Sequence, residues 1–580
     1  MRRAIVGVAC AVVLLAAGAP RRAAAQAGEA GAVELWQSGV PDAGAWLAEP
    51  GRAGWSSMRA LGLGAPLAHA GLVRGAWSFD DPAQPPEGRP FPGLVAALPP
   101  LSGYDSLTAE PGRALDSAGP ERSLGVVRPL TARDPAGKPR AVFQFMNGDF
   151  GLDETGLTAE RGGDAGHVRI EAFSGKRGEV GPYGEEGRHR WSAMLGRRFG
   201  AGELSGSYRQ AALAARLQSG EEQTARGGSG RVDWKSVYGG WSTAVGAARQ
   251  WDSHESFGAT LDPPSRRDAQ ELNVTGSTSR PFGLHELGFS GDWNHGRVAR
   301  RDTAATGVNH DDVWGTAWLT STGPLSRWTA ELGGGRIGAT GALEFAPALR
   351  FQRTFGARRL ELWAGRLLEP VWSDVADHGP GFLQSTWTAG AGWLRQSPTT
   401  LLHLRAIGGH THDRAVVARL PLEEQWLRDG IRRDPNPWQF VELWGEARWS
   451  RGVWLLGAEG FGLVKKSDPL QPRVDPDWTA SGWAEWGFHA FKGDLGVRLR
   501  AGAEGVGEHD TDEPTARVLP AYVTSSVAAT FTIGDAHVTL HARNLENARR
   551  DEVWIDSRTG LPARGTPREL RVALTWRLNN

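Results

Sequence analysis

The C-terminal stretch "RELRVALTWRLNN", residues 568–580, decides the fold. Two sets of side chains alternate along it, with Leu570, Val572, Leu574, Trp576 and Leu578 on one face and Arg571, Ala573, Thr575 and Arg577 on the other. This alternation predicts a β-strand whose two faces meet different surroundings. The end of a chain is normally poorly ordered unless it packs or pairs with other elements. A strand this regular at the terminus therefore requires neighbouring strands with which it pairs. We expect this strand to pair with the first strand of the sheet, near "RAVFQFMN", and so to close a barrel.

The same alternation recurs from residue 139 onward, in segments of about ten residues separated by turn residues. Examples are "DLGVRLRAGAE" at 494–504 and "AHVTLHARN" at 536–544. Counting the segments gives about 22 strands, an even number as expected for bacterial barrels. The segments near 155–174 and 326–352 show the weakest alternation. The pattern predicts an all-β chain that forms a transmembrane antiparallel β-barrel.

The connections between the segments support this prediction, because short and long ones alternate. Short connections, most of them with Gly or Pro, recur near Gly200, Gly239, Phe282, Pro324, Gly356, Pro398, Arg451, Gly493 and Gly534. Long polar connections are expected at 251–268, 297–310, 411–437, 465–477, 505–518 and 547–566. Tight periplasmic turns and long external loops are typical of outer-membrane barrels.

Tryptophans gather near the ends of the expected strands. Those near short turns or the C-terminus are Trp241, Trp328, Trp393, Trp449, Trp454 and Trp576, and those nearer the long loops are Trp293, Trp314, Trp438 and Trp478, with Tyr522. Two aromatic belts are expected where strands cross the two membrane interfaces. Tryptophan also favours strands in general, and that is the alternative explanation.

Composition excludes other classes. The chain has 580 residues, 40% of them hydrophobic, and a formal net charge of +0. This dispersed hydrophobicity does not fit a helical membrane protein, and the charge balance gives no indication of a nucleic-acid partner. A Ser-His-Asp set, an HExxH motif or a nucleophile elbow is not recognisable in the sequence. We therefore expect neither an enzyme nor a cofactor.

The N-terminus has the pattern of an export signal. Arg2 and Arg3 precede the apolar run "AIVGVACAVVLLAAGA", and "AAAQ" at 23–26 offers a cleavage site after Ala25. We expect 1–25 to be a signal peptide that is removed on export to the outer membrane of a Gram-negative-type bacterium. The alternative is an uncleaved membrane anchor. Cys10, the single cysteine, lies within this run, so the exported chain has no disulfide.

Residues 26–138 differ from the rest, being rich in Pro, Gly and Ala and without barrel-length alternation. We expect a separate periplasmic or luminal segment here, and the barrel at 139–580.

With "HARNLENARRDEVW" followed by "GLPARGTPRELRVALTWRL", the end of the chain resembles that of TonB-dependent outer-membrane receptors. In "HARNLENARRDEVW" at 541–554, Asn544, Leu545 and Asn547 match the family's Asn-Leu-Phe-Asn/Asp signature, with Glu546 in place of the aromatic residue. Pro567 and Arg568 stand where the family introduces its last strand. The strand number of the family, about 22, is also the same. Residues 26–138 contain no clear coupling box and no arginine-glycine plug motif, so a reduced plug is what the resemblance implies.

The resemblance implies uptake of a solute by a receptor-like barrel, with the N-terminal segment gating the lumen. Its partners would be outer-membrane lipid, the barrel-assembly machinery that inserts it, an energy-transducing inner-membrane complex and a small solute that the sequence does not identify. Two alternatives stay open: a passive porin-like channel, and an adhesion or scaffold barrel whose loops bind a partner.

The candidate binding residues are basic ones expected on the inner wall of the last strands. They are Arg498, Arg500, His537, His541, Arg543, Arg571 and Arg577. A cationic wall would favour anionic solutes. The alternative is that these side chains pair with carboxylates of neighbouring strands or of residues 26–138.

Three further motifs have ordinary explanations. Glu508, Asp510 and Asp512 in "EHDTDE" are weak candidates for a cation, since they lack the spacing of a calcium loop. His410 and His412 are too few ligands for a zinc site. "GGGRIG" at 333–338 satisfies GxGxxG, but no helix pattern follows it, as a nucleotide site requires.

Overall fold

The computed structural model describes a barrel and a small sheet that precedes it in the chain. It describes four strands within 33–130, and then residues 139–579 with gaps at 164, 179–182, 218–221, 259–260, 302–305, 339, 372–381, 398, 413, 419–429, 435–436, 467–476, 511–517, 549–550, 557–560 and 565–566. The expected signal peptide, 1–25, lies outside the described residues. The same is true of most of 26–138.

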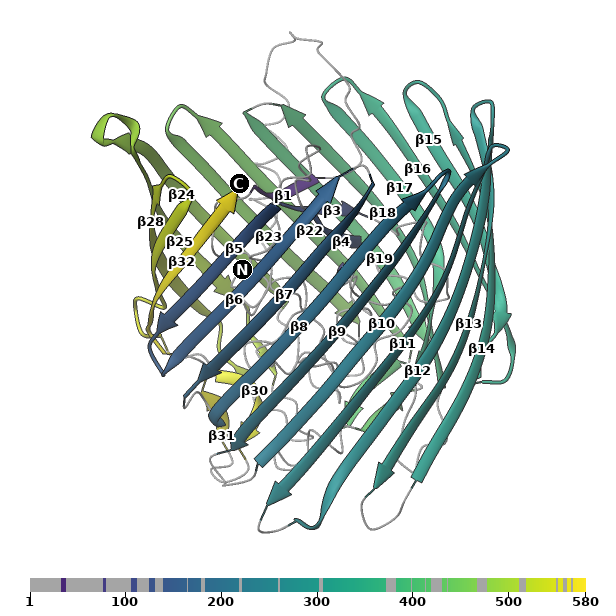
Figure 1. The fold of residues 1–580 in the computed structure, drawn as a ribbon, viewed down its shortest axis with the longest axis horizontal. Helices are drawn as coiled ribbons and strands as arrows, with labels where there is room; N and C mark the ends of the chain where they lie inside the picture. The colour runs from purple at the N-terminus through teal and green to yellow at the C-terminus, as the bar shows by residue number, and fades with distance from the viewer. Residues whose placement is uncertain are drawn as a thin grey trace.

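Twenty-two antiparallel strands form one closed barrel, which confirms the predicted architecture (Figure 1). Its strands are β5 (Pro139–Gly148), β6 (Leu152–Gly163), β7 (Gly166–Arg177), β8 (Tyr183–Phe199), β9 (Gly202–Leu217), β10 (Glu222–Tyr238), β11 (Trp241–Gly258), β12 (Leu261–Phe282), β13 (His285–Arg301), β14 (Thr306–Thr322), β15 (Ser326–Arg336), β16 (Leu343–Phe355), β17 (Arg358–Val371), β18 (Phe382–Ser397), β19 (Thr400–His412), β22 (Trp438–Arg451), β23 (Trp454–Lys466), β24 (Trp478–Ala490), β25 (Leu495–Val506), β28 (Tyr522–Ile533), β29 (Ala536–Arg543) and β32 (Glu569–Asn579). The two weakest sequence segments are full strands, β6 with β7 and β15 with β16.

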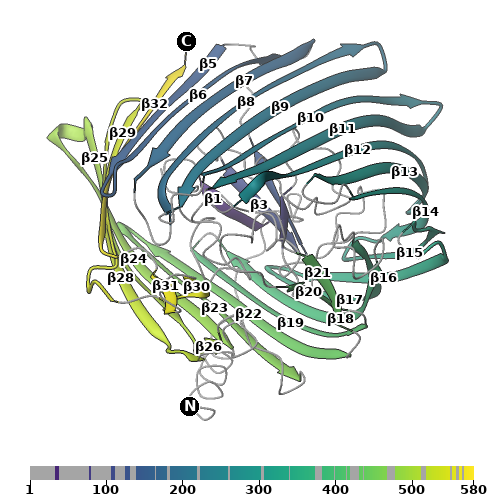
Figure 2. The same cartoon turned by 90° about the horizontal axis from the view of Figure 1, so that it is seen from below.

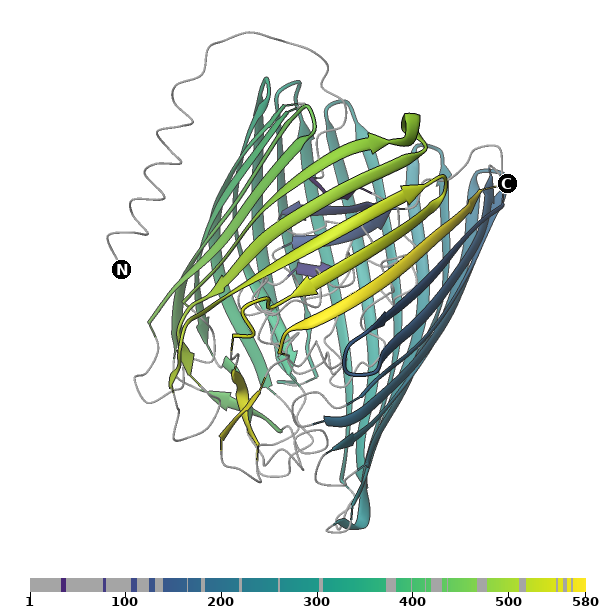
Figure 3. The same cartoon turned by 90° about the vertical axis from the view of Figure 1, so that its left-hand side faces the viewer.

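The C-terminal strand closes the barrel as expected. β32 pairs with β29 on one side and with the first barrel strand, β5, on the other, in a register that runs from Arg571 opposite Gly148 to Asn579 opposite Arg140. Figure 3 shows this seam, where the yellow C-terminal strand runs beside dark blue β5. Because each edge of β32 is paired, the strand stays regular almost to the chain end.

The two rims of the barrel differ. All nine predicted short turns join consecutive strands at one rim, which also holds the C-terminus and is uppermost in Figure 1; we call it the short-turn rim. The opposite long-loop rim carries three small hairpins: β20 (Arg414–Ala418) with β21 (Gly430–Asp434), β26 (His509–Asp510) with β27 (Val518–Leu519), and β30 (Asp551–Asp556) with β31 (Leu561–Arg564). A 3₁₀ turn, η5 (Phe491–Gly493), joins β24 and β25.

The predictions of two long loops are wrong. Residues 251–268 and 297–310 are mostly strand, since β11 runs to Gly258, β12 starts at Leu261, β13 runs to Arg301 and β14 starts at Thr306. The ends of these strands lie lowest at the long-loop rim in Figure 1. Beyond the membrane both faces of a strand meet polar surroundings, so the apolar alternation that reveals a strand disappears there.

Four strands precede the barrel and form a small sheet of their own. They are β1 (Val33–Gln37), β2 (Trp77–Phe79), β3 (Ser106–Pro111) and β4 (Gly125–Leu130), in the order β1-β3-β4-β2. β3 and β4 are antiparallel, whereas β2 and β4 are parallel. In Figure 2 this sheet lies within the ring of barrel strands. It is the part of 26–138 whose structure bears on the lumen.

The barrel wall has an apolar outer face and a polar inner face. In β32, Leu570 is 52% exposed on the outer face, whereas Ala573 on the inner face is 5% exposed. Trp241, Trp449, Trp454 and Trp576 are exposed near the short-turn rim, as the predicted belt requires. Trp314 is an exception: it is buried on the inner face against Ile337 and Ala346, so its place in the other belt was wrong.

In the described part of the chain, no helix is long and apolar enough to cross a membrane.

Candidate functional site

The inner wall of the last strands contains all seven predicted basic residues. Arg498 and Arg500 lie on β25, His537, His541 and Arg543 on β29, and Arg571 and Arg577 on β32. Cross-strand pairing links them, since His541 lies directly opposite Arg571. They form one basic region of the wall, and we call it the luminal basic wall.

Carboxylates contact part of the luminal basic wall. Arg571 donates a hydrogen bond to Glu569, with Nη2 2.7 Å from Oε2, and the Glu569 side chain is almost fully buried. Arg498 Nη1 lies 3.9 Å from Glu485 Oε1. These contacts are of the kind expected for inward charges, which usually form networks.

Two other members contact neutral groups. The Arg500 guanidinium lies over the Trp483 ring, 4.2 Å from its centroid. His537 Nδ1 is 3.0 Å from the Thr532 hydroxyl oxygen. The wall therefore combines charged groups with an aromatic ring and a hydroxyl group.

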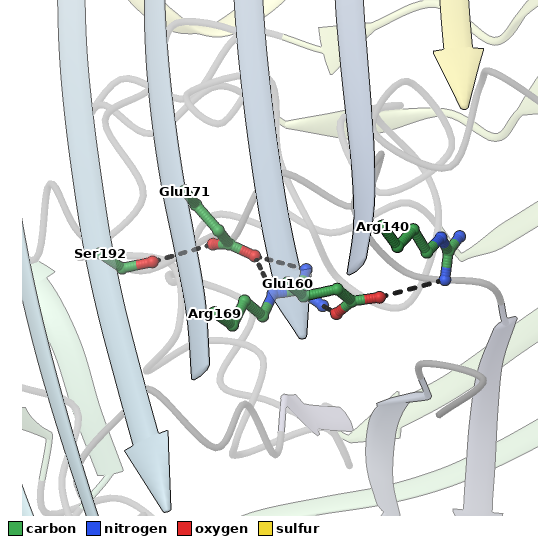
Figure 4. Close-up of polar contacts among 5 residues, drawn as sticks. All are labelled: Arg140, Glu160, Arg169, Glu171 and Ser192. Carbon is green, nitrogen blue, oxygen red and sulfur yellow. Dashed lines mark hydrogen bonds and ion pairs between the residues drawn. The ribbon is translucent and has the colours of Figure 1, made fainter. Parts of the chain in front are cut away.

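A second charged group, which the sequence analysis missed, lies on the neighbouring strands β5 to β8 (Figure 4). The Glu160 carboxylate bridges two guanidinium groups: its Oε1 is 3.2 Å from Arg140 Nη1 and its Oε2 is 3.0 Å from Arg169 Nη1. Arg169 Nε donates to Glu171 at 2.7 Å, and the Ser192 hydroxyl donates to the other oxygen of Glu171 at 3.0 Å. We call these five residues the β5–β8 network.

The centre of the β5–β8 network is almost inaccessible to solvent, whereas Arg140 and Glu160 at its edge are partly exposed. Arg169 and Glu171 are 5% and 4% exposed. Buried charges are costly unless they are paired and hydrogen-bonded, as these are. The network therefore fixes the arrangement of four neighbouring strands at the short-turn end of the wall.

A spacing in the sequence could have indicated the β5–β8 network. Arg169 and Glu171 are two residues apart, so they lie on one face of a strand. The same spacing joins Arg359 with Glu361 on β17, with Nε 2.8 Å from Oε1, and Arg231 with Asp233 on β10. An arginine followed two positions later by a carboxylate thus recurs on the inner face of this barrel.

The matching signature Asn544-Leu545-Glu546-Asn547 forms a tight turn at the long-loop rim. Asn544 and Asn547 both have positive φ angles, 49° and 53°, which asparagine tolerates better than most residues. The Asn544 side chain donates to the Ala548 carbonyl oxygen at 3.0 Å and accepts from the Ala548 N–H at 2.8 Å. Asn547 Oδ1 accepts from the Arg568 N–H at 3.0 Å, which links the turn to the approach of the last strand.

Asn544→Ala is expected to destabilise the barrel by about 1–3 kcal/mol, because it removes both bonds to Ala548 at a buried position and places alanine at positive φ. Unfolding in denaturant measures this. Asn544→Gly is the control: it loses the same bonds but not the backbone strain, so it should cost less. Equal stability of Asn544→Ala and wild type would contradict the role given to this turn.

Glu546, which replaces the family's aromatic residue, is held by Ser525. The Ser525 hydroxyl and the Ser525 N–H both donate to its carboxylate, and they lower its pKa from the ordinary value of 4.5. A carboxyl whose pKa is lower in the folded state stabilises that state above its unfolded pKa, and the contribution is lost as the pH falls through the folded value. We expect proteolysis at this turn to increase as the pH falls below the ordinary pKa of 4.5, and to lose that pH dependence in Glu546→Gln. An unchanged pH profile in the variant would contradict the assignment.

The other candidates do not assemble into a site. Glu508 is exposed, the Asp510 side chain is outside the described part and so is Asp512. His410 and His412 lie with Nε2 atoms 2.9 Å apart, as a pair. Among the residues that the structure describes, no group of three potential metal ligands occurs. In "GGGRIG" the strand β15 pairs with antiparallel strands and Gly333 faces the Trp314 ring, so packing accounts for the glycine.

Comparisons with known proteins agree on the fold. The sequence matches no protein-family model and no curated protein. Among solved structures, the siderophore receptor PirA from Acinetobacter baumannii has 10% identity and a TM-score of 0.66 over 86% of this chain and 88% of its own. The FrpB iron transporter from Neisseria meningitidis has 9% identity and a TM-score of 0.65 over 82% and 87%. The copper transporter OprC has 12% identity and a TM-score of 0.68 over 84% and 88%.

At these identities the likeness is one of fold. It covers most of each chain, and the strand number and closure agree with it. The resemblance inferred from the C-terminal motif is therefore confirmed at the level of architecture. The chain forms one closed barrel of 22 antiparallel strands, and its fold is similar to that of TonB-dependent receptors.

Proposed function

We propose that this barrel takes up a small solute across the outer membrane in the manner of a receptor, with residues 26–138 closing the lumen between transport events. The observation that carries the proposal is a closed barrel of 22 strands with a four-stranded sheet inside its ring (Figure 2). A barrel of this size without an internal domain would enclose a wide aqueous lumen. Its structural neighbours include a siderophore receptor, an iron transporter and a copper transporter.

The luminal basic wall is the surface that we propose for solute contact. Its arginines and histidines face inward on β25, β29 and β32, where a solute passing the lumen would meet them. Guanidinium groups hold carboxylate and phosphate groups through paired hydrogen bonds, so an anionic solute or an anionic metal chelate suits this wall. Arg498→Glu should then reduce the preference for anions in bilayer recordings of an opened barrel, and cation preference in the unmutated wall would contradict this.

Cellular uptake tests the proposal. Cells that express the protein and cells that lack it are compared for iron and copper accumulation, before and after an uncoupler collapses the proton-motive force. Receptor-like transport through an energy-transducing inner-membrane complex predicts accumulation that depends on the protein and stops with the uncoupler. Accumulation that continues with the uncoupler would favour the porin-like channel. Equal accumulation in cells with and without the protein would show that it transports neither iron nor copper.

A further inference from the structure

On the outer face of the described barrel strands, the positions nearest to the short-turn rim hold arginines and no carboxylate. Alternation of exposed and buried residues identifies the two outward positions of each barrel strand that lie nearest to this rim. In the described part of the chain these positions include seven arginines: Arg161, Arg197, Arg280, Arg353, Arg358, Arg395 and Arg451. Aspartate and glutamate occupy none of these same positions.

The opposite rim shows that this is not a general property of the outer surface. On the outward face near the long-loop rim, basic residues lie beside acidic ones. Arg266 Nη1 is 2.8 Å from Glu255 Oε1, and His295 Nδ1 is 2.8 Å from Asp311 Oδ1. At the short-turn rim, by contrast, the two outermost outward positions of the described strands hold arginines and no acidic residue.

Three of the arginines are concentrated on the neighbouring strands β16, β17 and β18. Arg358 and Arg395 lie directly opposite each other in the β17–β18 pairing. Arg353 is the diagonal neighbour of Arg358, since Phe355 is opposite Arg358 and Arg353 is opposite Leu360. Like charges directly opposite each other destabilise a sheet unless an anion lies between them.

The described residues next to these three arginines form an apolar surface, which we call the apolar floor, and provide no counter-charge. No ion pair joins these three arginines to a carboxylate of the described chain. The next outward residues toward the membrane centre are apolar, with Leu360 beside Trp393 and Leu362 beside Ala391. The Arg353 guanidinium lies over the Phe355 ring, 4.8 Å from its centroid, which restrains its position at the edge of the apolar band.

We propose that Arg353, Arg358 and Arg395 bind the phosphate group of an anionic phospholipid in the inner leaflet of the outer membrane. The short-turn rim is the periplasmic one by the pattern of turns and loops, so its outer edge meets that leaflet. Acyl chains would lie on the apolar floor while the arginines hold the phosphate through paired hydrogen bonds. This inference is independent of what the lumen transports.

Native mass spectrometry of the full-length protein tests the proposal, with phosphatidylglycerol and phosphatidylcholine as probes. The protein is released from mixed micelles of known composition, and the retained lipids are counted. Wild type should retain phosphatidylglycerol in preference to phosphatidylcholine. The variant R358Q/R395Q should lose retention of phosphatidylglycerol by roughly fivefold for each arginine removed.

The matched control is R226Q/R297Q, which removes two exposed outward arginines near the long-loop rim. It should retain phosphatidylglycerol like wild type. R358K/R395K keeps the positive charges but loses the planar guanidinium groups, and it should give intermediate retention of phosphatidylglycerol. Heat-modifiable gel migration confirms that each variant is a folded barrel. Equal retention of the two lipids by wild type, or equal loss in both glutamine variants, would overturn the proposal.

Discussion

Replacing Leu574 with arginine is expected to destabilise the inserted barrel by about 2–4 kcal/mol, because it places a charge on the lipid-facing surface near mid-membrane. Leu574 lies in the outward set of β32, opposite Phe145 on β5 and Val538 on β29. Both neighbours are apolar, so an arginine there finds no polar partner in the wall. Equilibrium unfolding in phospholipid vesicles measures the effect.

The neighbouring residue supplies the control. Ala573 faces the lumen and is nearly buried, opposite Met146 and Thr539. Because a large side chain would collide there, Ala573→Ser is the suitable replacement, and it should cost less than about 1 kcal/mol. If Leu574→Arg were tolerated as well as Ala573→Ser, the assignment of the two faces would be wrong.

Removing one partner of the β5–β8 network should have an effect of similar size. Glu171→Ala is expected to cost about 3–5 kcal/mol, because it leaves the buried Arg169 guanidinium without its closest carboxylate. Ser192→Ala removes a single neutral donor to the same carboxylate and should cost about 1 kcal/mol. Unfolding in denaturant ranks the two variants.

A double replacement separates the loss of a partner from the loss of the charges themselves. In Arg169→Met with Glu171→Met both charges of the most buried pair are gone and Glu160 keeps its contact with Arg140, so the double variant should recover most of the stability lost in Glu171→Ala. Equal destabilisation in the single and the double variant would mean that packing, not the unpaired charge, causes the loss.

The architecture could be predicted because lipid imposes a simple rule on every second residue. In β32 and β25 one face must be apolar, so the alternation in "RVALTWRL" and "LGVRLRAG" is visible in the sequence itself. The rule fails where lipid ends. The outer parts of β11 to β14 carry charged residues on their outward face as well, such as Glu255, Arg266 and Asp311, and they were therefore mistaken for loops.

The contacts on the inner wall were less predictable, because they depend on residues that are distant in sequence. The inward position of the seven basic residues followed from alternation. Their individual partners, such as Glu485 for Arg498, depend on which strands pair and in what register. Trp314 was assigned to a belt from its distance to a loop, whereas the parity of β14 turns it inward against Ile337.

Single-channel conductance in planar bilayers tests the central claim, a receptor-like barrel whose lumen the N-terminal segment closes. The mature full-length protein and a variant that lacks residues 26–138 are compared, after gel migration has shown that both are folded. The account predicts little or no steady conductance for the full-length protein and a large, stable conductance for the variant, since a barrel of 22 strands without its internal domain is wide. A full-length protein that conducts as well as the variant would contradict it.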